Sequence, residues 1–159
     1  MTDLQQTNWT DPEIVQWCQY LLDSYVHWMK QELIERTGTP LEQAERLFNS
    51  AFVVASHGAE DDPVLNYGNR AALDLWAMNW QQFTQTPSRL TAEPGKREER
   101  ERVLEQVKTQ GHISGYSGIR ISSSGQRFLA EQITIWNIHK PDGTAIGQGA
   151  TFVIWKYLS

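Results

Sequence analysis

Cysteine is scarce in this sequence: Cys18 is the only one in a chain of 159 residues. A single thiol cannot form an internal disulfide, and it leaves no cysteine-rich metal site. The chain also has no apolar run approaching the roughly 20 residues that a membrane-spanning helix needs. Its first ten residues, MTDLQQTNWT, lack the apolar core of a signal peptide. These absences predict a soluble, cytoplasmic protein with no membrane partner.

Positive charge is also in short supply, since 14 basic residues face 19 acidic ones and the formal net charge is −5. A charge of this sign gives no general attraction to phosphate backbones, so we expect no direct binding to nucleic acid. What the chain does have is apolar material, with 40% hydrophobic residues and seven tryptophans. At this length that is enough for one domain with a core of its own.

The first 50 residues are predicted to be helical. Asp11 and Pro12 form a typical helix start, and from Ile14 to Leu33 apolar residues recur at spacings of three and four. The stretch TGTP at 37–40 ends this long helix, and residues 41–49 form a second, shorter one.

After residue 50 the sequence changes to short strands and turns. FVVAS and VLNY are predicted strands of a hairpin joined by the polar turn SHGAEDDP, and two short helices follow. Residues 93–110 form a charged helix with few apolar residues, whose charges we expect to be solvated. From residue 112 onward three strands form a meander. This order predicts an α+β domain: one five-stranded antiparallel sheet with helices over one face.

The stretch LNYGNRAALDLW joins a predicted strand to a predicted helix, the kind of junction at which many α/β proteins bind phosphate. A phosphate-binding loop needs GxxxxGK[ST] and a dinucleotide turn needs GxGxxG, whereas this stretch has one glycine. Asn69 can instead cap the helix, because its side-chain oxygen can accept from amides two or three residues on. We therefore interpret Gly68 and Asn69 as a strand-to-helix corner.

Several segments resemble a known family. LNYGNRAALDLWAMNWQQFTQTPSR resembles the strand, Asn and short-helix pattern of PAS domains, and the final three strands with their Asp-Gly turn resemble the second half of that fold. SHGAEDDPVLNYGNRAALDLW, PSRLTAEP, YSGIRISSSGQRF and WNIHKPDGTAIGQGATF are more specifically similar to the MEKHLA domain. That PAS-related family occurs in bacteria, the form this chain resembles, and at the C-termini of certain plant homeodomain-zipper proteins. The resemblance implies a sensory PAS-like core at 51–159 after a helical extension at 1–50, and no enzyme activity.

PAS-like domains hold small ligands between their helices and the inner face of the sheet, and strand side chains alternate between faces. Aligning the turns with the flavin-binding PAS pattern implies an inner face of Tyr116, Gly118, Arg120, Glu131, Ile133, Ile135, Gln148, Ala150 and Phe152. The helical wall of the pocket would consist of Asn69, Leu73, Trp76, Phe83 and Arg89. A slip of one residue would exchange the two faces.

Three of the inward residues are polar: Arg120, Glu131 and Gln148. A buried charge is costly unless it is paired, and Arg120 and Glu131 lie close enough across a hairpin to neutralise each other. Alternatively, one of them anchors a polar or carboxylate ligand. In a third alternative both are exposed and the register differs.

The resemblance also bears on cofactors. In flavin-binding relatives the loop equivalent to TPSRL carries a reactive cysteine, where this chain has Ser88, and an arginine nearby, here Arg89. This argues against a covalent flavin photocycle and leaves noncovalent flavin open. Haem-binding relatives carry an axial histidine on the long helix before the meander, and residues 97–110 contain none. The cofactor therefore stays unassigned.

Residues for catalysis or metal binding form no recognisable motif. His57, Asp61 and Asp62 stand in one polar turn, which we interpret as solvated rather than as a metal site. No Ser/His/Asp or Cys/His set occurs in a motif context.

The outer face of the sheet is predicted to be apolar as well, through Ile119, Ile121, Trp136, Ile138 and Trp155. A face open to water should be polar, so something covers it. The candidate cover is the first helix, through Trp17, Tyr25 and Trp28. That helix would come either from the same chain or from a second copy in a homodimer.

The sequence thus predicts a PAS-like sensory or regulatory module that binds a small molecule or a protein partner. The alternative is a ligand-free interaction domain that dimerises or docks through the outer face. Either needs a partner for signalling, because the sequence contains no kinase, cyclase or DNA-binding segment.

Overall fold

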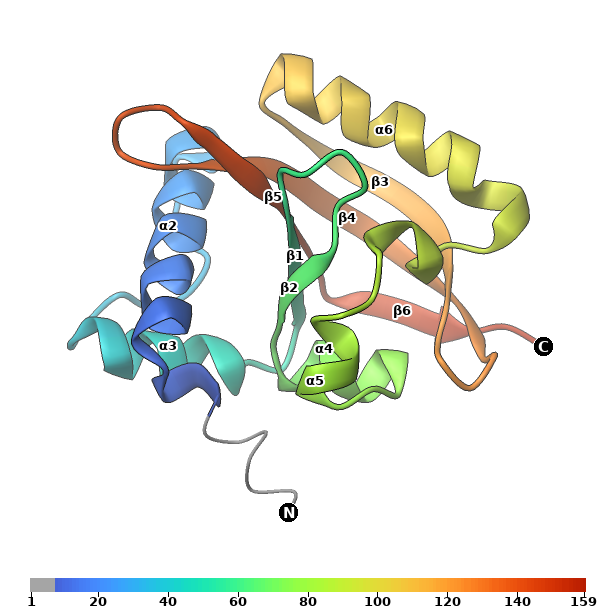
Figure 1. The fold of residues 1–159 in the computed structure, drawn as a ribbon, viewed down its shortest axis with the longest axis horizontal. Helices are drawn as coiled ribbons and strands as arrows, with labels where there is room; N and C mark the ends of the chain where they lie inside the picture. Colours follow the sequence, from blue (N-terminus) through green and yellow to red (C-terminus); the bar gives the residue numbers. More distant parts are fainter. Residues whose placement is uncertain (1–7) are drawn as a thin grey trace.

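The computed structural model describes residues 8–159. Its elements in chain order are η1 (Asn8–Thr10), α2 (Pro12–Met29), α3 (Pro40–Phe48), β1 (Val53–Gly58), β2 (Leu65–Gly68), α4 (Arg70–Trp76), α5 (Trp80–Phe83), η2 (Ser88–Thr91), η3 (Pro94–Lys96), α6 (Arg97–Gln110), β3 (His112–Ile121), β4 (Arg127–His139), β5 (Ala145–Phe152) and β6 (Ile154–Tyr157). Figure 1 shows α2 and α3 on one side of the sheet and α4, α5 and α6 on the other.

The sheet is antiparallel, with the strand order β2-β1-β5-β4-β3. The predicted α+β fold and its order of helices and strands are confirmed. The last predicted strand is divided, because β5 pairs with the second half of β4 and β6 pairs with the first half. We call the face toward α4–α6 the inner face and the face toward α2 and α3 the outer face.

Two bulges shift the register of the β3–β4 hairpin. Ile113 pairs with Ile135 and Tyr116 with Ile133, so β3 has one extra residue there, next to Gly115 with φ 76. Gly118 then pairs with Ala130, so β4 has one extra residue, and Gln132 has φ 54. Such a bulge moves the side chains beyond it to the opposite face.

The structure corrects two predicted positions. Glu131 was expected on the inner face, but its neighbour Ala130 packs in the inner core, and Glu131 itself is half-buried opposite Ile154 of β6. Trp155 was expected on the outer face, but it packs against the inner core. Neither position is readable by alternation alone: the bulge at Gln132 breaks the two-residue period in β4, and the break at Val153 between β5 and β6 places both Phe152 and Trp155, three residues apart, in the inner core.

Helix α2 is shorter than predicted. Asp11 caps its start by accepting a hydrogen bond from the amide of Glu13, but the helix ends at Met29 because Lys30 takes a left-handed conformation. The apolar spacing continued to Leu33 because the next segment still packs on the same core. Arg36 holds that segment in place, donating to Asp23 on α2 and to Gln43 on α3.

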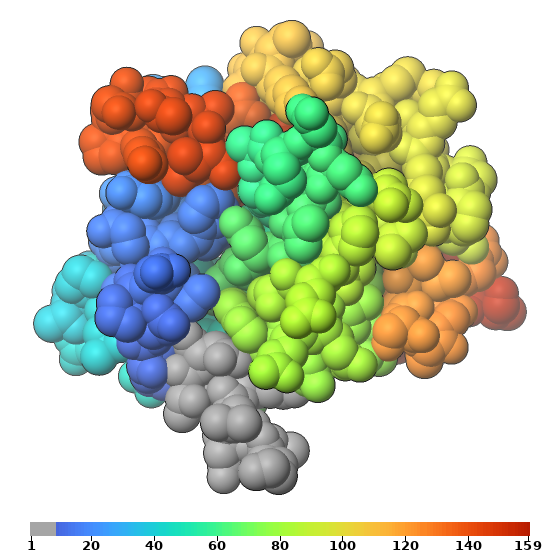
Figure 2. All heavy atoms as spheres, in the orientation of Figure 1, coloured from blue at the N-terminus to red at the C-terminus, as the bar shows by residue number. Residues whose placement is uncertain are grey.

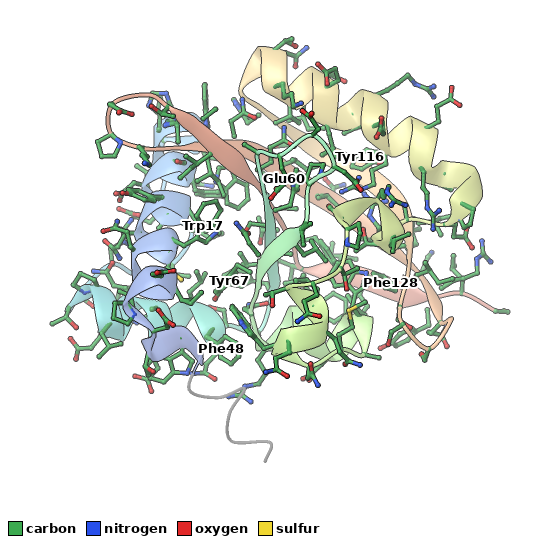
Figure 3. All side chains as sticks on the ribbon, in the orientation of Figure 1. Trp17, Phe48, Glu60, Tyr67, Tyr116 and Phe128 are labelled. Atoms are coloured by element: carbon green, nitrogen blue, oxygen red, sulfur yellow. The ribbon has the colours of Figure 1, made fainter. Side chains whose placement is uncertain are left out.

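The same chain covers its own outer face. Trp136, Ile138 and Tyr25 are buried in one core with the apolar side of α2, and Trp17 and Trp28 pack against it. Of the two covers that the sequence left open, the structure therefore has the helix of the same chain. Trp17 projects from α2 toward the sheet (Figure 3), and its indole donates to the Ser56 hydroxyl at 2.9 Å.

Tryptophan hydrogen bonds and a glycine fix the distance between α2 and the sheet. The Trp28 indole donates to the Asn137 carbonyl at 2.9 Å, and the Trp136 indole donates to the Leu21 carbonyl at 3.2 Å. A Cβ added at Gly149 would lie 2.8 Å from the Trp136 ring. Glycine at this position lets the ring lie flat on the backbone of β5.

We predict that Trp136→Ala lowers the free energy of unfolding by about 3–5 kcal/mol, because it leaves a large hole in a fully buried core. Urea denaturation measures this. Trp155→Ala, at a half-buried position near the sheet edge, is the matched control and should cost less. Equal, small effects of the two substitutions would contradict the covered outer face.

Candidate functional site

A cavity of about 70 Å³ lies between the inner face of the sheet and the α4–α6 side of the molecule. It is lined by Ala55, Ser56, His57, Leu65, Trp76, Phe83, Ser88, Thr91, Arg100, Leu104, Arg120, Ile133, Ile135, Gln148, Gly149, Ala150 and Phe152. In Figure 2 the atoms of the β1–β2 turn, of the 80–96 segment and of α6 adjoin one another on the face shown. Strands and helices from the whole core thus contribute to one internal space.

Aromatic rings form much of the apolar wall. Trp76 meets Phe83 and Phe152 edge to face, with ring centroids 6.1 and 6.3 Å apart. Phe83 lies against the backbone of β2, because a Cβ added at Gly68 would come within 2.6 Å of its ring. Edge-to-face contacts of this kind hold aromatic side chains in fixed positions, so this wall is rigid.

Two arginines stand out among the lining residues, because both are buried: Arg100 is 7% exposed and Arg120 is 8% exposed. Neither forms an ion pair with any residue of the described stretch 8–159. Arg100 donates to the Ser88 hydroxyl. Arg120 donates to the Ile119 carbonyl at 3.1 Å. A buried charge is ordinarily paired, so the cavity carries an excess of positive charge.

Tyr116 contacts the Arg120 guanidinium, and Gly118 leaves room for both side chains. The guanidinium carbon lies 5.8 Å from the centroid of the Tyr116 ring, a cation–π distance. A Cβ added at Gly118 would come within 2.7 Å of Arg120 Nη1 and 3.0 Å of the Tyr116 hydroxyl. Tyr116 lies between α6 and the sheet (Figure 3), so it backs the arginine without lining the cavity itself.

The charge of Arg100 is costly in this position. Burial first and the positive charge of Arg120 second lower the pKa of the Arg100 guanidinium from 12.5 to about 10, against the smaller opposing effects of Tyr116 and Glu101. Arg100 nevertheless stays protonated at neutral pH. The neighbouring Glu101 is exposed and forms no ion pair with it among the described residues.

Gln148 contributes an acceptor that has no partner. Its amide nitrogen donates to the Leu104 carbonyl at 3.1 Å and to the Asn137 side-chain oxygen at 3.2 Å. Because the Leu104 carbonyl can only accept, the orientation of the Gln148 amide is fixed. Its oxygen Oε1 is buried and has no hydrogen-bond partner among the described residues.

His57 lies beside Gln148 on the neighbouring strand and is also buried. Its Nδ1 is 3.0 Å from the Gly58 carbonyl, which accepts the hydrogen, and its Nε2 has no partner within residues 8–159. Burial first and the charge of Arg100 second lower the pKa of His57 from 6.5 to about 4, against the smaller opposing effects of the Gly58 carbonyl, the Gln148 side chain and Glu60. The imidazole is therefore neutral at physiological pH.

The structure corrects the interpretation of His57 as part of a solvated turn. Strand β1 continues through Gly58, which pairs with Gly147 of β5. His57 thus reaches the cavity wall, whereas Asp61 and Asp62 are exposed in the turn that follows.

We predict that the stability of the protein falls as the pH is lowered from 7 to 5. In this range His57 takes up a proton in the unfolded protein but not in the folded one. With pKa values of 6.5 unfolded and about 4 folded, the loss between pH 7 and pH 5 is about 2 kcal/mol. Urea denaturation at both pH values measures it, and His57→Gln should remove about that much of the pH dependence. Gln106→Ala, an exposed change on α6 that removes no titrating group, is the control; an unchanged slope in His57→Gln would refute the buried neutral imidazole.

The structure brings most of the predicted pocket residues together. Those that line the cavity are Trp76, Phe83, Arg120, Ile133, Ile135, Gln148 and Phe152. Leu73 is buried in the inner core without lining the cavity. Arg89 is exposed and pairs with Asp62 at 3.2 Å, so it does not reach the cavity.

Asn69 has a structural part in the fold. Its side-chain oxygen accepts hydrogen bonds from the amides of Ala72 and Val54, each at 3.1 Å, and its amide donates to the Phe52 carbonyl at 2.8 Å. It therefore caps α4, as the sequence predicted, and ties that helix to β1. It does not line the cavity.

Sequence reasoning missed Arg100, the most unusual residue of the site. The charges of the 93–110 helix were interpreted as mostly a solvated face, and Arg100 was not singled out from them, but it is buried. It precedes Val103, Leu104 and Val107 at spacings of three, four and seven, so it belongs to the apolar side of α6. That spacing was the available signal.

Solved structures with this arrangement of strands and helices are PAS domains. A PAS domain from Colwellia psychrerythraea matches with a TM-score of 0.61 at 16% identity, covering 71% of this chain and 94% of that one. A Light-Oxygen-Voltage domain studied with a flavin analogue matches with a TM-score of 0.58 at 11% identity, covering 74% and 85%. An RNA-binding Light-Oxygen-Voltage receptor matches with a TM-score of 0.60 at 13% identity, covering 76% and 33%. The protein therefore has a PAS-like fold.

The MEKHLA domain matches residues 15–157, and the chain belongs to the MEKHLA domain family, a PAS-like sensory family. Homeobox-leucine zipper protein HOX10 of Oryza sativa subsp. indica is 24% identical over 151 residues, and so is HOX10 of subsp. japonica. The match covers 92% of this chain and 18% of those proteins, so the chain spans about a fifth of their length. None of the helices formed by residues 8–159 has the length and hydrophobicity to cross a membrane.

Proposed function

We propose that this protein is a sensory or regulatory module that binds a small molecule in the cavity between α4–α6 and the inner face of the sheet, without chemistry of its own. The observation that carries the proposal is a set of buried groups in the cavity wall. Among residues 8–159 the charged ones have no ion-pair partner and the neutral ones have no hydrogen-bond partner. They are the two arginines and the atoms His57 Nε2, Trp76 Nε1 and Gln148 Oε1. Buried polar groups are nearly always satisfied, so a bound molecule is their natural partner.

The site also has a route to the opposite face of the sheet. Ser56 lines the cavity beside His57, and its hydroxyl accepts a hydrogen bond from the Trp17 indole of α2. A ligand that shifts β1 therefore acts on α2, the helix that covers the outer face. In this proposal α2 passes the bound state to a protein partner.

Native mass spectrometry of freshly purified protein tests the proposal, with denaturing conditions as reference. We expect a retained mass that is released on denaturation, and Ala150→Phe, which places a ring in the cavity, should abolish it. Ala145→Phe, at an exposed position on the same strand, should keep it. The proposal fails if the protein carries no such mass and no small molecule raises its melting temperature.

A second candidate function is self-association through the part of the outer face that α2 leaves open. Ile119, Leu129 and Lys156 are aligned across β3, β4 and β6, and Ile154 next to them is 51% exposed. Val153, between β5 and β6, is 71% exposed. An apolar group at the edge of a sheet favours pairing with a second copy of the chain.

If this candidate is right, the protein is a dimer that Ile154→Lys converts to a monomer, because the new charge would be buried in the interface. Light scattering after size-exclusion chromatography reports the mass. Tyr157→Lys, an exposed change on the same strand whose partner Phe128 lies in the inner core, is the control. A monomeric parent protein at high micromolar concentration would exclude this function.

A further inference from the structure

The two buried arginines identify the kind of ligand that the cavity takes. Both are fixed by the same short segment: Arg100 donates to Ser88, and the backbone of Arg120 forms an isolated bridge with Ala92. Each guanidinium has five N–H donors, and the hydrogen bonds described above use one of each. Two cations with free donors therefore face the same end of one cavity.

No acidic side chain of the described residues forms an ion pair with either arginine, although Glu101 favours the charged form of Arg100 from a distance. The residues that line the cavity include no Asp or Glu. Glu60 is exposed in the turn after β1 and accepts from the amide of Val64, and Glu101 points to solvent on α6. Because the desolvation of two like charges is costly, an anion from outside the chain would relieve the repulsion between Arg100 and Arg120.

Resting on the proposed function, we propose that the ligand is a small carboxylic acid, bound as its carboxylate between Arg100 and Arg120 with an apolar body against the aromatic wall. The planar fork of arginine matches the two oxygens of a carboxylate. The other walls are Leu65, Trp76, Phe83, Ile133 and Phe152. An all-polar anion such as phosphate would turn oxygens toward these apolar walls. A carboxylate with a short hydrocarbon body instead places its charge at the two arginines and its hydrocarbon against the walls.

The volume limits the size of the acid. One water-sized probe needs about 10–15 Å³, so the cavity of about 70 Å³ holds a molecule of about five to seven nonhydrogen atoms. Acids of four or five carbons, such as butyrate, isobutyrate and valerate, have this size. A dicarboxylate would bring a second charge to a wall without a further cation among the described residues.

The test compares butyrate with butyramide, which has the same shape and no charge. Calorimetric titration and thermal melting of protein freed of ligand by unfolding and refolding should show binding of the acid and none, or much less, of the amide. Inorganic phosphate and succinate are the all-polar and the doubly charged probes. We expect Arg100→Gln and Arg120→Gln each to weaken butyrate binding about 10- to 100-fold.

The same two variants separate a binding arginine from a structural one. Loss of an unpaired buried charge should raise or preserve the melting temperature of the ligand-free protein, while butyrate no longer raises it. Arg102→Gln, an exposed change on α6, is the matched control and should change neither value. If both arginines are purely structural, their replacement lowers the ligand-free melting temperature and leaves butyrate binding intact.

The results distinguish two claims: that the protein binds a small molecule, and that this molecule is a carboxylate. Equal binding of butyrate and butyramide, binding of phosphate alone, or a neutral retained mass would overturn the carboxylate and leave the small-molecule module standing. Absence of binding by every probe, together with absence of a retained mass, would overturn both.

Discussion

A sheet with two apolar faces has to be covered twice, and the rest of this structure depends on that constraint. The N-terminal helices close the outer face, where the Trp136 ring packs against Gly149 of β5 and its indole donates a hydrogen bond to the Leu21 carbonyl of α2. The buried apolar residues are therefore divided between two cores, one on each face of the sheet. On the inner face the helices and the sheet leave a cavity of about 70 Å³ between aromatic rings, room for several water-sized groups in an interior that is normally close-packed.

The cavity is unusual for its charge rather than for its size. Placing Arg100 and Arg120 in the same apolar surroundings destabilises the ligand-free protein, and the low pKa of His57, at about 4, is a further sign of that environment. A chain selected for stability alone would have apolar residues at these positions. The arrangement makes sense if binding of an anion offsets the repulsion between Arg100 and Arg120. The free energy of ligand binding then also drives a change in the protein.

Much of the fold could be predicted from the sequence because local signals were consistent. The cap at Asn69, the Asp-Gly turn and the alternation in β5 each specify one structure, and all agree with one sheet. The bulges could not be predicted, because Gln132 is not a residue type that signals a left-handed conformation. Glu131 was placed on the wrong face for that reason, and Trp155 was misplaced because the strand is broken at Val153, between β5 and β6. Arg100 was missed because its charge outweighed its position, at helical spacing from Val103, Leu104 and Val107, on the apolar side of α6.

The central claim is that Arg100 and Arg120 together bind one carboxylate, and a crystal structure of the protein with butyrate tests it most directly. The account predicts one carboxylate whose oxygens lie about 2.8 Å from N–H groups of both guanidiniums, with the hydrocarbon end against Trp76 and Phe152. Butyrate elsewhere, or an inner cavity in which Arg100 and Arg120 pair with acidic side chains of the protein itself, would contradict the account.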